Sequence, residues 1–97
     1  MKEYKRFTIT VDERTLNADE RKLHRIGIAL KHFSDEECGK ARELHKAAEI
    51  ARESGDFEKA QRCEASARSH SYLAEMYFDD AMDVYDVLGI KNAMFCR

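Results

Sequence analysis

The chain has 97 residues, of which 43% are apolar and 37% are charged, with no proline, four glycines and a formal net charge of −2. This length suits one domain, and the composition is too apolar for a disordered chain and too charged for a membrane span. Too few turn residues are present for a β-sandwich or barrel, and the balanced charge gives the whole chain no basic footprint for nucleic acid. The sequence therefore predicts one all-α domain.

The first predicted element is an N-terminal strand or extended arm over residues 1–16. Residues 5–11, Lys-Arg-Phe-Thr-Ile-Thr-Val, alternate polar and apolar side chains and are rich in β-branched residues, which is typical of a half-buried strand. A single strand leaves its backbone groups without partners. We therefore expect this segment to pair with another chain, to pack on the helices as an arm, or to be held by a partner.

Two helices are expected next, over residues 18–33 and 35–54. In the first, Leu23, Ile26, Leu30 and Phe33 recur at the spacing of a buried stripe, and Asn17 or Asp19 can cap its start. The sequence Ser34-Asp35-Glu36-Glu37 has the form of a capping box. We therefore expect the second helix to begin at this point.

A third helix is predicted over residues 56–88, after a tight turn at Gly55-Asp56. Gly55 can adopt the left-handed conformation that ends a helix, and Asp56 can cap the next one. Small residues face each other across this turn, which favours an antiparallel hairpin with closely packed helices. The expected fold is a three-helix, mostly antiparallel bundle with an N-terminal strand or arm.

The C-terminal half of the third helix carries a wide apolar face, and an apolar tail follows it over residues 90–97. A face that covers about half of the helix circumference needs more than one neighbour. We expect it to be covered by the first helix or by a second copy of the chain. The candidate interface residues are Tyr77, Phe78, Met82 and Tyr85 of the helix and Met94 and Phe95 of the tail.

The remaining face of the third helix is acidic. Its carboxylates, Glu75, Asp79, Asp83 and Asp86, are spaced as a stripe along one side. Such a stripe is ordinarily a solvated surface, but it can also imitate the phosphates of a nucleic acid. By analogy, small phage-type inhibitors present acidic helix faces to nucleic-acid-binding proteins, and this is one alternative function.

The stretch from Ala41 to Ala67 resembles one unit of the tetratricopeptide repeat family. The resemblance lies in the turn Gly55-Asp56-Phe57-Glu58-Lys59-Ala60, with Ala48 before it and Ala67 after it. In that family, small residues at these positions allow the two helices of each unit to pack tightly, and stacked units bind peptides or proteins. The resemblance implies a helical hairpin that takes part in protein binding.

The N-terminal strand followed by helices resembles the ribbon-helix-helix regulators. Their strands pair across a dimer and place alternate polar side chains in the major groove of DNA. On this alternative, Arg6, Thr8 and Thr10 would contact DNA while the apolar residues between them face the core. Residues 1–33 hold eight basic and five acidic groups, a balance of +3, which fits this interpretation.

The cysteines and histidines show no metal-binding pattern. Three cysteines without a CxxC pair, and no signal-peptide pattern, indicate free thiols in the cytoplasm. The four histidines have no HxxxH spacing, so we expect no metal and no cofactor. No glycine-rich phosphate loop or catalytic constellation is present, so we do not expect an enzyme.

The sequence favours a non-enzymatic protein-interaction module, a small adaptor or regulator. Its partner is expected to be another protein or, in a homodimer, a second copy. A nucleic acid is the less favoured partner, and no membrane association is expected. The DNA-binding regulator and the acidic inhibitor remain open as alternatives.

Overall fold

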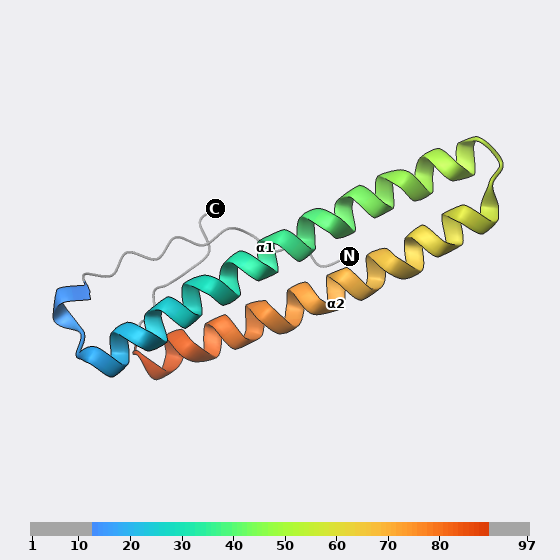
Figure 1. Ribbon diagram of the computed structural model, residues 1–97. Helices are drawn as coiled ribbons and strands as arrows, with labels where there is room; N and C mark the ends of the chain where they lie inside the picture. Colours follow the sequence, from blue (N-terminus) through green and yellow to red (C-terminus); the bar gives the residue numbers. More distant parts are fainter. Residues whose placement is uncertain (1–12, 90–97) are drawn as a thin grey trace.

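Residues 13–89 form two long antiparallel helices joined by a tight turn. A computed structural model describes these residues. A short 3₁₀ turn, η1 (Glu13–Thr15), leads into α1 (Ala18–Glu53), and α2 (Phe57–Val87) returns alongside it. Figure 1 shows the two helices side by side over most of their length. The chain therefore enters and leaves the described structure at the same end of the hairpin, which we call the open end.

The prediction of a three-helix bundle with an N-terminal strand is wrong. The helices expected at 18–33 and 35–54 are a single continuous helix, α1. The part of the chain that the structure describes contains two α-helices and no strand. The expected strand at 5–11 and the apolar tail at 90–97 lie outside the described residues. The all-α prediction is confirmed for residues 13–89, with a long hairpin in place of the bundle.

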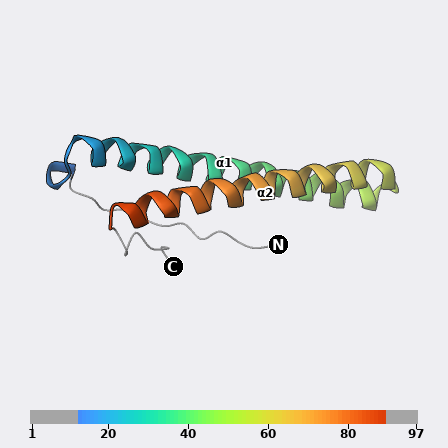
Figure 2. The same cartoon turned by 90° about the horizontal axis from the view of Figure 1, so that it is seen from below.

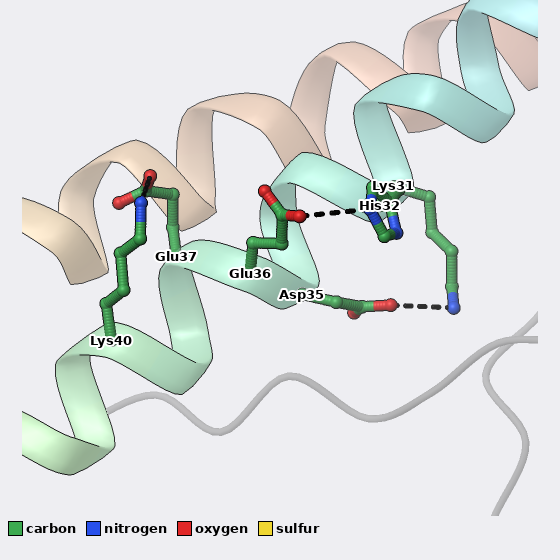
Figure 3. Close-up of polar contacts among 6 residues, drawn as sticks. All are labelled: Lys31, His32, Asp35, Glu36, Glu37 and Lys40. Atoms are coloured by element: carbon green, nitrogen blue, oxygen red, sulfur yellow. Dashed lines mark hydrogen bonds and ion pairs between the residues drawn. The ribbon is translucent and has the colours of Figure 1, made fainter.

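Ion pairs one turn apart carry the helix through Ser34, where a break was expected. Lys31 Nζ lies 2.8 Å from Asp35 Oδ2, and His32 Nε2 lies 3.0 Å from Glu36 Oε1. Figure 3 shows both pairs spanning the same turn of α1. Pairs at this spacing stabilise a helix. The acidic residues that resembled a capping box therefore act as partners inside a helix.

The hydroxyl of Ser34 has a different role from the expected cap. It is buried, and Ser34 Oγ donates a hydrogen bond to the backbone carbonyl of Ala74 on α2, at 2.8 Å. This bond joins residues 40 positions apart in the sequence. The Ser34 hydroxyl therefore joins α1 to α2 and does not cap a new helix.

The helix ends that do form have recognisable caps. Asn17 and Glu20 make a reciprocal capping box, with Asn17 Oδ1 accepting from the Glu20 amide and Glu20 Oε1 accepting from the Asn17 amide. At the turn, Gly55 has a φ of +82°, which favours glycine. Asp56 Oδ1 then accepts from the Lys59 amide to cap α2. The predicted helical hairpin is confirmed, with its turn at Gly55-Asp56.

The two helices meet along a line of small residues spaced seven apart. All of them are buried. We call this line the seam; it consists of Gly27, Ser34, Ala41 and Ala48 on α1 and Ala60, Ala67, Ala74 and Ala81 on α2. A strict repeat of seven keeps the seam facing the partner helix by a gradual left-handed winding. Figure 2 shows the helices crossing at a shallow angle.

A seam of small side chains brings the helices together but buries little apolar surface. Burying a methyl-sized group contributes about 0.8 kcal/mol, whereas a leucine or phenylalanine contributes about 1.5–3 kcal/mol. The molecule measures 57 × 24 × 15 Å, so its thinnest dimension is close to that of a single layer of helices. Apart from Phe78 and Tyr85, which are buried, the larger apolar residues of α1 and α2 are covered only in part.

Candidate interaction surface

One side of the hairpin is lined with large apolar residues near the open end. The ring of Phe33 on α1 contacts that of Tyr77 on α2, with centroids 5.5 Å apart. Residues three, four, seven or ten positions from these two lie on the same side of each helix. We call this surface the apolar side; it consists of Leu23, Ile26, Leu30 and Phe33 on α1 and Leu73, Tyr77, Val84 and Val87 on α2.

The side chains of the apolar side remain substantially open to solvent. Ile26 is 50% exposed and Phe33 is 45% exposed, and Val87 is exposed at the end of α2. Leu23, Leu30, Leu73, Tyr77 and Val84 are of intermediate exposure. Isolated apolar residues are common on protein surfaces, whereas a group contributed side by side by two helices is a candidate binding surface.

A polar group borders the apolar side midway along the hairpin. Nδ1 of His70 is hydrogen-bonded to Oε2 of Glu37 across the helices, and Lys40 Nζ lies 3.3 Å from Glu37 Oε1. Figure 3 shows Lys40 reaching back to Glu37 along α1. The hydrogen bond from His70 lowers the pKa of Glu37, burial opposes this, and Lys40 lowers it further. Glu37 is therefore held as a carboxylate at neutral pH.

The opposite side of the hairpin is polar in the half near the turn. Arg52 and Glu64 form an ion pair between the two helices. Beside it lies an open hollow of about 420 Å³ with side chains of both charges. Its lining residues are His45, Glu64, Arg68, Ser71, Tyr72 and Glu75. The two sides of the hairpin thus differ in character, because one is apolar near the open end and the other carries ion pairs and hydroxyls.

The described cysteines and histidines do not form a reactive or metal-binding group. Burial raises the pKa of the Cys38 thiol, so it is a poor nucleophile. Cys63 packs against the alanines near the turn. His24 is buried with its ring edge-on to Tyr85. Within residues 13–89, no three His, Cys, Asp or Glu side chains come together as a site for a metal ion.

The structure separates the residues that were grouped as a candidate interface. Phe78 and Tyr85 are buried within the hairpin of one chain, and burial raises the pKa of Tyr85 to about 12. Tyr77 belongs to the apolar side. Met82 lies seven residues after Glu75, which lines the hollow, and so it falls on the polar side. Met94 and Phe95 lie outside the described residues.

The structure describes the acidic residues of α2 but not the candidate DNA contacts. Asp79, Asp83 and Asp86 are exposed along α2, and Glu75 is of intermediate exposure beside the hollow. The structure therefore places the acidic face on the surface, where a partner could reach it. The candidate DNA contacts Arg6, Thr8 and Thr10 lie outside the described residues.

Sequence reasoning found the stripe Leu23, Ile26, Leu30 and Phe33 but assigned it to the buried core. The structure places this stripe beside the seam, because Gly27 and Ser34 face α2 instead. The signal that could have shown this is the repeat of small residues every seven positions along both helices. A large-residue stripe next to a small-residue stripe on one helix indicates two neighbours.

Comparisons with known proteins identify no relative. No family model matches the chain, and no curated protein or solved structure is similar to it. The resemblance to a tetratricopeptide repeat therefore remains a prediction, since the observed hairpin of 36 and 31 residues does not by itself show such a repeat. Neither α1 nor α2 contains a stretch long and apolar enough to cross a membrane.

Proposed function

We propose that this protein is a non-enzymatic protein-interaction module that holds its partner on the apolar side. The observation that carries the proposal is the exposure of Ile26 and Phe33 on an apolar side built by both helices, where Phe33 contacts Tyr77. A small adaptor or regulator requires such a surface on a stable frame. The hairpin supplies the frame through its seam, which leaves the large apolar side chains available for contact.

The arrangement of the apolar side fits the usual anatomy of a protein interface. Such interfaces have an apolar centre that contains aromatic anchors and a polar rim around it. Here Phe33 and Tyr77 form an aromatic pair within the apolar residues. Glu37, Lys40 and His70 form a polar border on the side toward the turn. This arrangement supports a specific docking surface in preference to scattered surface hydrophobics.

We also place the protein in the cytoplasm as part of this proposal. The support is the cysteine usage, because Cys38 and Cys63 are free thiols. A reducing compartment keeps such thiols from pairing.

Ile26 and Ile28 provide a matched test of this function. The two residues are 50% and 47% exposed, but they lie on different faces of α1. A photo-crosslinking amino acid at position 26, introduced in cells that express the protein, is expected to form adducts with a second polypeptide. The same probe at position 28 is expected to form few. Adducts at 26 confined to the same molecule, or equal yields at both positions, would contradict the proposal.

The two alternative functions remain predictions. The exposure of Asp79, Asp83 and Asp86 is compatible with an acidic inhibitor. An ordinary solvated helix surface has the same exposure. The DNA-binding regulator depends on Arg6, Thr8 and Thr10, outside the described residues. The apolar side favours the interaction module, because the acidic inhibitor needs no exposed apolar surface and the contacts of the DNA-binding regulator lie outside the described residues.

A further inference from the structure

We infer that the partner on the apolar side is an amphipathic helix of another protein, with lysine or arginine on the flank that faces α2. This inference rests on the proposed function and names the chemistry of the partner. It follows from three features of the hairpin near its open end. These are the charge along one border of the apolar side, the helical spacing of the apolar residues, and the length over which they extend.

α2 carries unpaired negative charge beside the apolar side. From residue 69 to residue 89, the chain has five carboxylates and no lysine or arginine. Four of these carboxylates are exposed: Asp79, Asp80, Asp83 and Asp86. Within residues 13–89, none of the four forms an ion pair. A partner that approaches this part of α2 therefore meets carboxylates that no cationic side chain of the hairpin has paired with.

Two of these carboxylates border the apolar side. Asp80 lies one heptad from both Leu73 and Val87, so it is on the same side of α2 as these two residues. Asp83 lies four residues before Val87, on the outward flank. We call Asp80 and Asp83 the acidic edge. A partner that covers the apolar side places its own flank against the acidic edge, where lysine or arginine is attracted and a carboxylate is repelled.

The spacing of the apolar residues indicates that the partner is a helix. α1 and α2 run side by side (Figure 1), and each contributes a stripe of apolar residues to the apolar side. A third helix laid between two such stripes contacts both, in the way that amphipathic helices bind apolar surfaces of other proteins. An extended segment would find no strand to pair with in residues 13–89, whereas a helix satisfies its own backbone hydrogen bonds.

The extent of the apolar side sets the length of the partner helix. On α2 it runs from Val87 at the open end to Leu73, which is about 21 Å at a rise of 1.5 Å per residue. Toward the turn it is bordered by the hydrogen bond between His70 and Glu37. A partner helix of about 14 residues, or four turns, spans this distance.

Binding of designed peptides to the full-length chain tests this chemistry. The lysine peptide has about 14 residues, with leucines at helical spacing and lysines on both flanks. The glutamate peptide keeps the leucines but has glutamates on the flanks, and the scrambled peptide has the composition of the lysine peptide without its spacing. Fluorescence anisotropy is expected to show that the lysine peptide binds about tenfold more tightly than either of the others. Its advantage over the glutamate peptide is expected to shrink in about 1 M salt, which screens the charges.

Reversing the charge of the acidic edge tests its role. The double variant Asp80→Lys, Asp83→Lys is expected to reverse the preference, so that the glutamate peptide binds more tightly than the lysine peptide. This gain of binding also shows that the variant is folded. The matched control is Glu49→Lys, Glu53→Lys. These two residues are exposed and lie four and eight positions after His45, which lines the hollow on the other side, so the preference is expected to stay unchanged.

A neutral change on the apolar side tests the apolar contact. Ile26→Ser is expected to weaken binding of the lysine peptide by about fivefold, because a half-exposed isoleucine loses its apolar contact with the peptide. Ile28→Ser makes the same change on another face of α1 and is expected to leave binding unchanged.

The outcomes separate this inference from the proposed function. No binding of the lysine peptide, equal binding of the lysine and glutamate peptides, or a preference that reversal of the acidic edge leaves unchanged overturns the basic helix, even if crosslinking at position 26 finds another protein. A scrambled peptide that binds as tightly as the lysine peptide also overturns it, because charge alone would then suffice. Equal effects of Ile26→Ser and Ile28→Ser, together with equal crosslinking at both positions, overturn both.

The segment that crosslinks to position 26 in cells provides a second readout. Mass spectrometry of the adduct is expected to find a segment with apolar residues at helical spacing and an excess of lysine and arginine. A segment of this chain from a second copy, or an acidic segment of another protein, would overturn the inference while leaving the apolar side as the interaction surface.

Discussion

The phenol ring of Tyr85 on α2 occupies the space that a side chain at Gly27 on α1 would need. A Cβ atom at position 27 would lie 2.8 Å from Tyr85 Cζ and 2.9 Å from its hydroxyl oxygen. Real Cβ atoms essentially never approach another atom so closely, and the Tyr85 ring is fully buried. Gly27 therefore lets the largest residue of the hairpin core sit directly on the backbone of the other helix.

Replacement of Gly27 by alanine is expected to destabilise the protein, although the same change usually stabilises a helix by about 1 kcal/mol. The added Cβ must displace the Tyr85 ring, so we expect a net loss of about 1–3 kcal/mol in the free energy of unfolding. Gly39→Ala is the control, because a Cβ there meets no atom within 4 Å. It is expected to stabilise. Urea unfolding of both variants measures the difference, and equal stabilisation by both would show that Tyr85 does not pack on Gly27.

The alanine seam is expected to reject larger side chains. Ala67 is fully buried at the seam, whereas Ala65, two residues earlier on α2, is exposed. Ala67→Leu must push the helices apart, so we expect it to lower the free energy of unfolding by about 1–3 kcal/mol. Ala65→Leu adds the same atoms on the surface and is expected to change stability by less than about 0.5 kcal/mol. Thermal unfolding followed by circular dichroism tests this, and equal tolerance of the two leucines would exclude a tight seam.

The hydroxyl of Ser34 is expected to stabilise the hairpin through its bond to Ala74. Ser34→Ala keeps a small residue at the seam but removes this buried hydrogen bond, so we expect a loss of about 1 kcal/mol. Ser69 provides a comparison, because its hydroxyl donates to the carbonyl of Ala65 within its own exposed helical turn. Ser69→Ala is expected to be neutral or slightly stabilising. The prediction fails if denaturant unfolding gives both serine variants the same stability.

Acid is expected to weaken the hairpin through Glu37. Its pKa is lowered in the folded protein by the hydrogen bond from His70. The unfolded chain therefore takes up the proton first, and the stabilisation is full above the ordinary pKa of 4.5. It is lost as the pH falls below that value. Glu37→Gln is expected to lower stability at pH 6 and to approach the wild type at lower pH.

The control for this pH dependence is Glu43→Gln. Glu43 is exposed on the outer face of α1. Its replacement by glutamine removes the same charge without affecting the contact with His70. Unfolding free energies of the three proteins across the acid range measure the effect. A constant difference between Glu37→Gln and the wild type at every pH would contradict the role assigned to this carboxylate.

The sequence predicts the hairpin but not the length of its first helix. Gly55-Asp56 is a local signal, since both residues act within one turn, and the small residues on each side of it indicate close packing. The sequence around Ser34 is ambiguous, because a serine followed by acidic residues suits a helix start and also suits a helix interior with basic partners one turn earlier. The deciding contact, with Ala74, lies 40 residues away. No local pattern contains it.

The predicted interface residues and the proposed apolar side share Tyr77 alone among the described residues, for a related reason. Tyr77 belongs to the apolar side, but Phe78, its neighbour in sequence, is buried within the hairpin. Periodicity shows that a wide face exists without showing which edge of it meets α1. The register of α1 against α2 sets that edge, and it depends on the seam as a whole. Leu23, Ile26 and Leu30 were likewise identified as apolar but not as part of the surface.

Thiol labelling at positions 26 and 28 tests most directly whether the apolar side is the interaction surface. Ile26→Cys and Ile28→Cys, each in a chain without other cysteines, start from similar exposures of 50% and 47% in the single hairpin. We predict that the cysteine at position 26 is labelled about tenfold more slowly than that at 28 when the partner is bound, and that the difference disappears on dilution, because only position 26 is buried by association. Equal labelling rates at every concentration and in cells would contradict this account.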